Sequence, residues 1–95
     1  MKNSEFEWDD EKAKSNLKKH DVSFEEGATI FNDPKIATIS DPDHSEDEER
    51  FISIGISVIR RLLTVIHTYR TERIRLISAR KATKAEKKNY ENYQD

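Results

Sequence analysis

Residues 73–83 read RIRLISARKAT and decide the fold, because they combine a strand pattern with a row of cations. Arg73 and Arg75 lie two positions apart, so an extended chain projects both from one face of a sheet. Ile74 and Leu76 then project from the opposite face, where they can join a core. The pattern predicts a strand with guanidinium groups on one side and apolar side chains on the other.

A helix start follows this strand directly. Thr83 is the expected N-cap, and Glu86 three residues later completes a capping box. Arg80 and Lys81 come immediately before this helix start. Backbone N–H groups at a helix N-terminus, set beside clustered arginine and lysine, suit a phosphate group.

The chain before this strand also contains segments with an extended pattern. Their apolar and β-branched residues predict strands, and the short connections between the last three strands favour antiparallel neighbours. Ile52, Ile54 and Ile56 are expected to face the core. The predicted strands span residues 36–40, 51–57, 62–69 and 72–79, and an acidic loop occupies residues 41–49.

Helical patterns occupy both ends of the chain. A short strand at residues 6–8 leads into a helix that ends near His20, and Ser23 caps a second, short helix that residues 32–34 stop. A last helix is expected over residues 83–93. The predicted fold class is α+β, with a mainly antiparallel sheet of about four or five strands, two N-terminal helices and one C-terminal helix.

The length of 95 residues suits one domain with a modest core, so residues 1–95 are expected to form a single domain. The absence of cysteine excludes disulfides and thiolate metal sites. No apolar stretch resembles a signal sequence or approaches the length of a membrane span. A cytoplasmic protein with no membrane partner is therefore the default expectation.

Charge divides the sequence into an acidic and a basic half. Residues 1–49 hold 6 Lys and Arg against 15 Asp and Glu, a net charge of −9, whereas residues 50–95 hold 11 against 4, a net charge of +7. If the halves fold together, one surface can be basic and bind an anionic ligand although the whole chain is slightly acidic. The alternative is that the two halves neutralise each other across the fold.

Three blocks of the sequence resemble the BrnT family of type II toxins, in the family's order. They read FEWDDEKAKSNLKKHDVSFEEGATIFNDP at residues 6–34, DPDHSEDEERFISIG at 41–55 and RIRLISARKATKAEKKNYE at 73–91. The resemblance implies a RelE-like fold and an endoribonuclease that acts on RNA and arrests growth. It also implies a cognate BrnA-type ribbon-helix-helix antitoxin, with DNA contacted only through that antitoxin and a heterotetramer as the expected complex. The sequence departs from the family at Asp21 and in the turn from Val58 to Arg61, where the family usually has Gly.

Cleavage of RNA without a metal ion requires removal of the 2′-hydroxyl proton, neutralisation of the phosphate and protonation of the leaving 5′-oxygen. Arg80 and Lys81 are the leading catalytic candidates, because the resemblance implies that lysine and arginine alone can serve. The alternative for Arg80 is a salt bridge to Glu86 or to the acidic N-terminal half, and the alternative for Lys81 is a solvated helix start. Arg73 and Arg75 are candidates for substrate binding through their forked donors. No metal and no cofactor are expected.

His67 is the candidate proton carrier, because an unperturbed histidine titrates near pH 6.5. It lies on the strand that precedes the arginine strand. Depending on the register across the intervening turn, it stands opposite Ile74, Arg73 or Arg75. The alternative is a half-buried structural histidine, since its strand neighbours on the same face are apolar.

For the remaining cations and histidines, a structural role stands beside each possible functional role. Lys19 and His20 are candidates for substrate binding, although helix termination also explains cations at that place. His44 lies in the acidic loop, whose spacing matches no known calcium loop, so a metal site there is not expected. Arg60 and Arg61 are expected to be solvated at a hairpin tip.

An alternative function belongs to a different class. The chain would then be a non-catalytic nucleic-acid- or protein-binding module that acts as a co-repressor with a DNA-binding antitoxin. Such a module would bind RNA in a strongly salt-dependent way and form no product.

Overall fold

The computed structural model describes residues 5–41 and 48–93, so most of the acidic loop, including His44, lies outside the described residues. The expected strands are present with ends that shift by one or two residues. The segment expected as a second helix divides into an α-helix and a 3-10 helix. In chain order the elements are β1 (Phe6–Glu7), α1 (Asp10–His20), α2 (Phe24–Ala28), η1 (Thr29–Asn32), β2 (Ala37–Ser40), β3 (Phe51–Ile56), β4 (Leu62–Arg70), β5 (Arg73–Lys81) and α3 (Lys84–Asn92).

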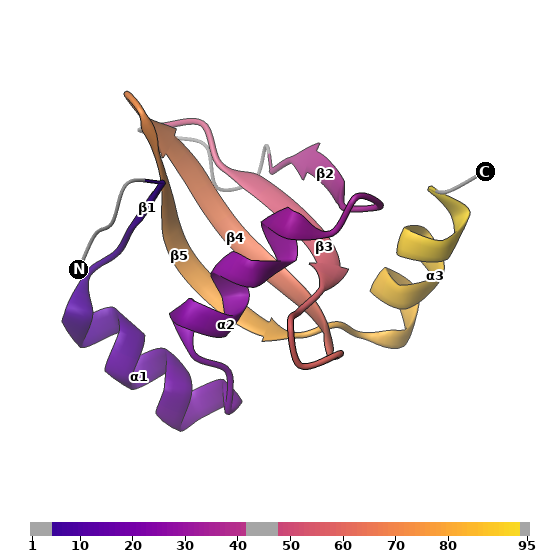
Figure 1. The fold of residues 1–95 in the computed structure, drawn as a ribbon, viewed down its shortest axis with the longest axis horizontal. Helices are drawn as coiled ribbons and strands as arrows, with labels where there is room; N and C mark the ends of the chain where they lie inside the picture. Colours follow the sequence, from indigo (N-terminus) through magenta and orange to yellow (C-terminus); the bar gives the residue numbers. More distant parts are fainter. Residues whose placement is uncertain (1–4, 42–47, 94–95) are drawn as a thin grey trace.

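The five strands form one sheet in the order β1-β5-β4-β3-β2 (Figure 1). The strands β2 to β5 pair antiparallel with their neighbours, and the short connections from β3 to β4 and from β4 to β5 predict this for the last three strands. The edge strand β1 pairs parallel with β5, with Phe6 opposite Ile74 and Glu7 opposite Arg75. The sheet is therefore mixed, and its parallel pair joins the start of the described chain to a strand in its last third.

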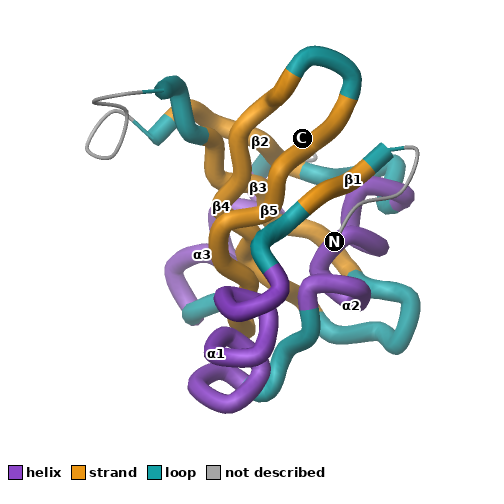
Figure 2. The backbone as a smooth tube through the Cα atoms, turned by 90° about the vertical axis from the view of Figure 1, so that its left-hand side faces the viewer, coloured by secondary structure: helices purple, strands orange, loops and turns teal. Residues whose placement is uncertain are grey.

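One layer of helices covers one face of this sheet. In Figure 1, α2 lies in front of β4 and β5, and α1 lies below them beside the β5 edge. Figure 2 shows the β4–β5 turn projecting at the top, beyond the helices. The buried core between the helices and the sheet consists of Trp8, Val22, Phe24, Ile30, Leu63, Val65, Leu76 and Ala79.

Both glycines of the chain lie where the helix layer meets the sheet. A Cβ atom on Gly27 would lie 3.1 Å from the Cβ of Ala79 in β5. A Cβ atom on Gly55 would lie 3.0 Å from the Cβ of Ile30 in η1. The absence of side chains at these two positions lets the helices approach the strands closely.

The third helix, α3, packs on the opposite face of the sheet. Its buried Tyr90 lies against Ala37 and Ile54, and the Tyr90 hydroxyl donates to Asp33 Oδ2 at 2.6 Å. Burial and this bond to a carboxylate raise the pKa of Tyr90 to about 12. The bond ties the C-terminal helix to the segment between η1 and β2.

The expectation that Ile52, Ile54 and Ile56 face the core is confirmed for Ile54, which is buried in the smaller core cluster under α3, and is wrong for Ile56. Ser53 and Gly55 face the helix layer, since Gly55 lies under Ile30 and Ser53 pairs with the core residue Val65. Alternate residues of a strand point to opposite faces, so the three isoleucines point away from the helix layer. Of these, Ile54 is covered by α3, and Ile56 is exposed.

A side chain closes the edge of β5 beyond β1. Asn16 of α1 donates from Nδ2 to the carbonyl of Ala79 at 2.8 Å, and its Oδ1 accepts from the Ala79 N–H at 3.1 Å. These are the two bonds that a neighbouring strand would make. The same Nδ2 donates to the carbonyl of Val22 at 2.9 Å, so Asn16 fixes α1 against β5.

Two non-glycine residues with positive φ lie where the sequence departs from the BrnT pattern. Asp21 ends α1 with φ 58°, and Arg60 in the β3–β4 turn has φ 70°. Glycine adopts this left-handed conformation without steric cost, whereas aspartate and arginine adopt it at some cost. The backbone keeps these turns with other residues.

Candidate nucleic-acid interface

Arg73 and Arg75 lie on one face of β5, as the alternation predicts, with Leu76 buried in the core on the other face. A register shift at Ile77 then puts Arg80 on the same face as Arg75, because these two residues pair with Thr64 and Thr68 of β4. Arg73 begins the strand opposite Arg70 at the hairpin turn. Arg75 forms an ion pair with Glu7 of β1, with Nη1 2.9 Å from Oε2. A substrate phosphate that binds Arg75 must therefore share it with Glu7 or displace that carboxylate.

Arg80 is held by the first turn of α3. Its Nη1 and Nη2 donate to the two carboxylate oxygens of Glu86 at 2.7 and 2.8 Å. Glu86 Oε1 also accepts from the Thr83 N–H at 2.9 Å, and Thr83 Oγ1 accepts from the Glu86 N–H at 3.1 Å, which confirms the capping box. Burial alone would raise the pKa of Glu86, but hydrogen bonds from Arg80, Thr83 and Thr64 outweigh it and lower this pKa to about 2.

Lys81, the last residue of β5, is exposed and points to the face of the sheet opposite Arg80. It lies near Glu26 of α2. A hydrogen bond from Arg61 is the main reason that the pKa of Glu26 is lowered, and the charge of Lys81 contributes in the same direction. Arg80 and Lys81, although adjacent in sequence, therefore present their charges on different sides.

A groove between α1 and β5 gathers several of the chain's cations. It has a volume of about 210 Å³. Lys19 and His20, both predicted to bind substrate, line it together with Lys12, which was not predicted. The hydroxyls of Ser15 and Ser78 complete a lining of donors suited to an anion. The full lining is Lys12, Ser15, Asn16, Lys19, His20, Ile77 and Ser78.

The spacing of polar residues in the sequence indicates part of this groove. Lys12, Ser15 and Lys19 follow one another at intervals of three and four residues, which places them on one face of a helix. The contribution of Ser78 cannot be recognised in this way. It depends on how α1 packs beside β5, and Asn16 fixes that position through a contact 63 residues away in sequence.

His67 is fully buried, with 0% of its surface exposed. Its Nε2 lies 2.7 Å from Ser53 Oγ, which in turn lies 2.7 Å from Thr38 Oγ1. The ring of Phe31 meets it edge-on at a centroid distance of 4.9 Å. Burial lowers the pKa of His67 to about 4, so the imidazole is neutral near pH 7.

The register across the β4–β5 turn also differs from each of the predicted alternatives. His67 stands opposite Leu76, because Arg70 pairs with Arg73 across the turn. A bulge follows between Ile66 and His67, where the pairing shifts by one residue. The structure thus separates His67 from the arginines, places Arg73, Arg75 and Arg80 on one face of β5, and brings Lys19 and His20 together in the groove.

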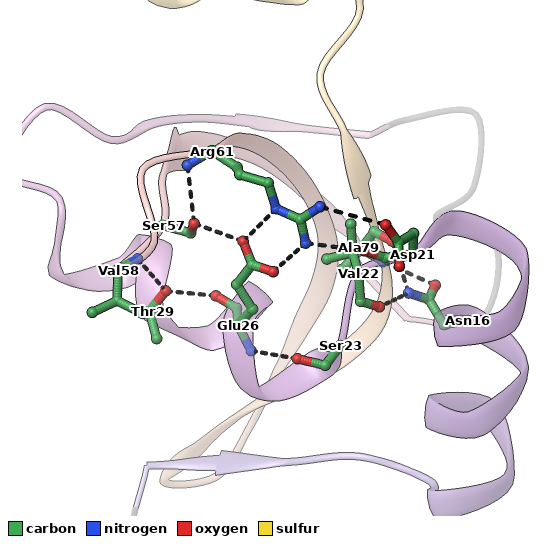
Figure 3. A network of polar contacts seen from close by, with 10 residues as sticks. All are labelled: Asn16, Asp21, Val22, Ser23, Glu26, Thr29, Ser57, Val58, Arg61 and Ala79. Carbon is green, nitrogen blue, oxygen red and sulfur yellow. Dashed lines mark hydrogen bonds and ion pairs between the residues drawn. The ribbon is translucent and has the colours of Figure 1, made fainter.

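Arg61 is not solvated at the hairpin tip, contrary to expectation (Figure 3). It makes a bidentate contact with Glu26, in which Nε lies 2.9 Å from Oε2 and Nη2 binds Oε1. Its Nη2 also donates to the Asp21 carbonyl at 3.0 Å, and the Ser57 hydroxyl donates to Glu26 at 2.7 Å. This network fastens the β3–β4 turn to the connection between α1 and α2, beside Asn16.

Two further observations concern the described residues 5–41 and 48–93. Within them, no group of three or more His, Asp or Glu side chains is placed to hold a metal ion. The helices there are also too short or too polar for any of them to cross a membrane.

Comparisons with known proteins identify the family and the fold. Residues 8–86 match the family model described as the ribonuclease toxin BrnT of type II toxin-antitoxin systems. The fold is similar to the crystal structure of the Brucella abortus ribonuclease toxin BrnT, with a TM-score of 0.62 and 21% sequence identity over 86% of this chain and 100% of that chain. No curated protein matches the chain. At this identity the structural likeness concerns the fold alone, whereas the family match covers most of the sequence.

Proposed function

The chain belongs to the BrnT family of ribonuclease toxins of type II toxin-antitoxin systems, and from this premise we propose that it is a metal-independent endoribonuclease. The proposed reaction is transesterification at an RNA phosphate. The 2′-oxygen attacks phosphorus and the bond to the 5′-oxygen breaks. The products carry a 2′,3′-cyclic phosphate and a 5′-hydroxyl.

The groove between α1 and β5 is the observation that carries this proposal. Lys12 and Lys19 both line this recess, so their long side chains can bring positive charge to a phosphate bound there and neutralise charge that grows on its oxygens. His20 lines the same recess and is partly exposed, so it can reach a substrate. An imidazole can take the 2′-hydroxyl proton and return a proton to the leaving oxygen.

The other residues that the sequence predicted for the site have secondary roles in this proposal. Lys81 is exposed three residues beyond Ser78 of the groove and suits a neighbouring phosphate. Arg73 and Arg75 suit the substrate backbone further along β5. Arg80 is about one third exposed and keeps N–H donors beyond the two that bind Glu86, so a phosphate there would share it with that carboxylate. His67 can contact RNA only when its aromatic surroundings open.

The proposal is tested with purified protein, a single-stranded RNA and excess EDTA, followed by analysis of the product ends. We expect cyclic phosphate and 5′-hydroxyl ends. His20→Asn is expected to lower the rate by at least about 100-fold, since proton transfer by a positioned side chain typically contributes that much. Lys19→Ala is expected to weaken substrate binding.

Lys14→Ala is the matched control, because Lys14 lies on the same helix but lines a different hollow beside Trp8. It removes the same charge and is expected to leave cleavage within about twofold of the original rate. Full activity of His20→Asn would remove the groove from the mechanism. Loss of activity in EDTA that Mg²⁺ restores would overturn metal independence.

The family implies an antitoxin partner and an RNA substrate. We propose that the antitoxin is a BrnA-type ribbon-helix-helix protein that contacts DNA on behalf of the complex, that the complex is a heterotetramer and that the toxin acts in the cytoplasm. We also propose that residues 1–95 form one domain of RelE-like type. Size measurement of the co-purified complex tests the stoichiometry.

A non-catalytic co-repressor remains the second candidate, and the ion pairs of β5 favour it. Arg75 and Arg80 are each engaged by a carboxylate, which suits a stable surface better than a reactive one. A co-repressor would bind RNA with strong salt dependence and release no product. Growth arrest on expression without the antitoxin would separate the toxin from the co-repressor.

A further inference from the structure

A hollow of about 390 Å³ lies at the end of the sheet near the β4–β5 turn, away from the groove between α1 and β5. Apolar and aromatic side chains form part of it, and two carboxylates and an amide form the rest. The residues that line it are Glu5, Phe6, Phe31, Asn32, Glu72 and Ile74. Neither the proposed catalysis nor the fold explains why exposed acidic residues surround partly exposed rings here.

The apolar part of the hollow belongs to a continuous cluster of rings. Phe6 and Phe31 lie 5.6 Å apart between centroids, and Phe31 in turn contacts His67. Tyr69 contacts His67 at 5.4 Å. The Tyr69 ring is 55% exposed although it belongs to this cluster.

Tyr69 borders the hollow through strand pairing. It stands directly opposite Ile74, which lines the hollow, and paired residues on neighbouring strands project to the same face. An exposed aromatic face beside an apolar recess is the arrangement on which single-stranded nucleic acids stack their bases. The cations Arg70 and Arg73 flank the same turn.

The polar part of the hollow favours a base over a phosphate. Glu5 and Glu72 would repel an anion, and Glu72 makes no ion pair with any described residue. A carboxylate accepts hydrogen bonds and donates none, so it matches base edges that carry an amino group. Guanine, adenine and cytosine have such a group, and uracil lacks one.

We propose that this hollow binds an unpaired, amino-bearing nucleobase of the RNA, stacked against Tyr69 and hydrogen-bonded to Glu72. The inference rests on the proposed function in that the base belongs to the RNA substrate. Ile74 and Ser78 lie four residues apart on β5, or about 13 Å at the usual rise of a strand. The base site and the cationic groove can therefore contact one RNA strand at separate nucleotides.

The test measures binding without cleavage, by NMR titration of amide-labelled protein with GMP, CMP, AMP, UMP and inorganic phosphate. We expect GMP, CMP and AMP to shift amide signals of Phe6, Tyr69 and Ile74, and UMP to bind at least about fivefold more weakly. Tyr69→Leu is expected to lower GMP affinity by at least about fivefold, as loss of a stacking side chain does. Glu72→Gln is expected to bring GMP and UMP affinities close together, because an amide both donates and accepts.

Two exposed residues of α3 and its end provide matched controls. Tyr93→Leu removes a ring that is 58% exposed, and Glu91→Gln removes an exposed carboxylate, both on an element that does not line the hollow. Both are expected to bind GMP as the original protein does. Equal shifts with phosphate alone, equal affinity for UMP, or an equal loss in the controls would overturn the base site.

The experiments distinguish a failure of the base site from a failure of the proposed ribonuclease function. A protein that binds GMP at Tyr69 but leaves RNA intact refutes the ribonuclease proposal and keeps the base site. A protein that cleaves RNA but shows no shift at the hollow with any nucleotide refutes the base site and keeps the ribonuclease.

Discussion

Replacement of Asn16 by leucine is expected to destabilise the protein more than any exposed substitution on α1. Asn16 is 8% exposed and makes three hydrogen bonds, to the N–H and carbonyl of Ala79 and to the carbonyl of Val22. Leucine has a similar size but makes none of them. It would leave buried backbone groups of β5 without partners.

The magnitude follows from the number of bonds. Each contributes about 0.5–1.5 kcal/mol net to stability, so the loss of all three corresponds to about 3 kcal/mol. For a domain of this length, a loss of that size lowers the melting temperature by roughly 12–24 °C. The exposed neighbour Ser15 provides the control, since Ser15→Ala is expected to change stability by less than about 0.5 kcal/mol.

Urea unfolding followed by circular dichroism measures the free energy of unfolding for each variant, and equal slopes confirm that the same transition is compared. Asn16→Asp adds a second readout. Its carboxyl would face two carbonyl oxygens, which raises its pKa in the folded state, so the variant should be destabilised more at pH 7 than at pH 4 relative to the original protein. A loss below about 1 kcal/mol for Asn16→Leu would show that the side chain does not close the sheet edge.

Two further predictions concern the protonation of a buried histidine and the strain of a backbone turn. The unfolded state of His67 takes up a proton near pH 6.5 and the folded state only near pH 4, so stability is complete above pH 6.5 and falls by about 3 kcal/mol as the pH decreases to 4. His67→Gln should remove this fall in pH-dependent urea unfolding and keep RNA cleavage at pH 7.5 within about tenfold; a loss beyond about 100-fold would restore His67 to the catalytic site. Arg60→Gly should stabilise the protein by about 0.5–1 kcal/mol because φ is 70° there, whereas Val58→Gly in the same turn, where φ is not positive, should destabilise it by a similar amount. Thermal unfolding of the two glycine variants compares them directly, and the same sign for both would contradict the strain argument.

The sequence was sufficient for features that depend on nearby residues. The alternation from Arg73 to Leu76, the capping box of Thr83 and Glu86 and the antiparallel order of the last strands each involve short distances along the chain. Local patterns of this kind determine the backbone conformation and which side chains project from the same face of a helix or strand.

Features that depend on the packing of the helices against the sheet could not be predicted from local sequence patterns. Periodicity groups Ile52, Ile54 and Ile56 on one face but does not tell which face the helices cover. The ion pair of Arg61 with Glu26 joins residues 35 positions apart. A partner at such a distance becomes known only when the packing of the layers is known.

The residues of the candidate site show the same difference between local features and features that depend on packing. The cationic character of β5 was evident from composition, and the salt bridge of Arg80 to Glu86, one of the alternatives predicted for Arg80, is confirmed. His67 was a reasonable proton carrier by residue type alone. Its burial follows from Phe31 and Ser53, which come from different elements of the fold.

The placement of the glycines makes the protein unequally tolerant of mutation. Turns with positive φ can gain a glycine, but the contact between η1 and β3 cannot lose Gly55, whose missing Cβ would also lie 3.2 Å from the rigid backbone oxygen of Ile30. A single methyl group there would lift η1 from the strands and move Phe31 with it. On the proposed base site, which Phe31 lines, variants at Gly55 would alter which RNA sequences are cut, so a random library should yield specificity changes from Gly55 that direct contacts do not explain.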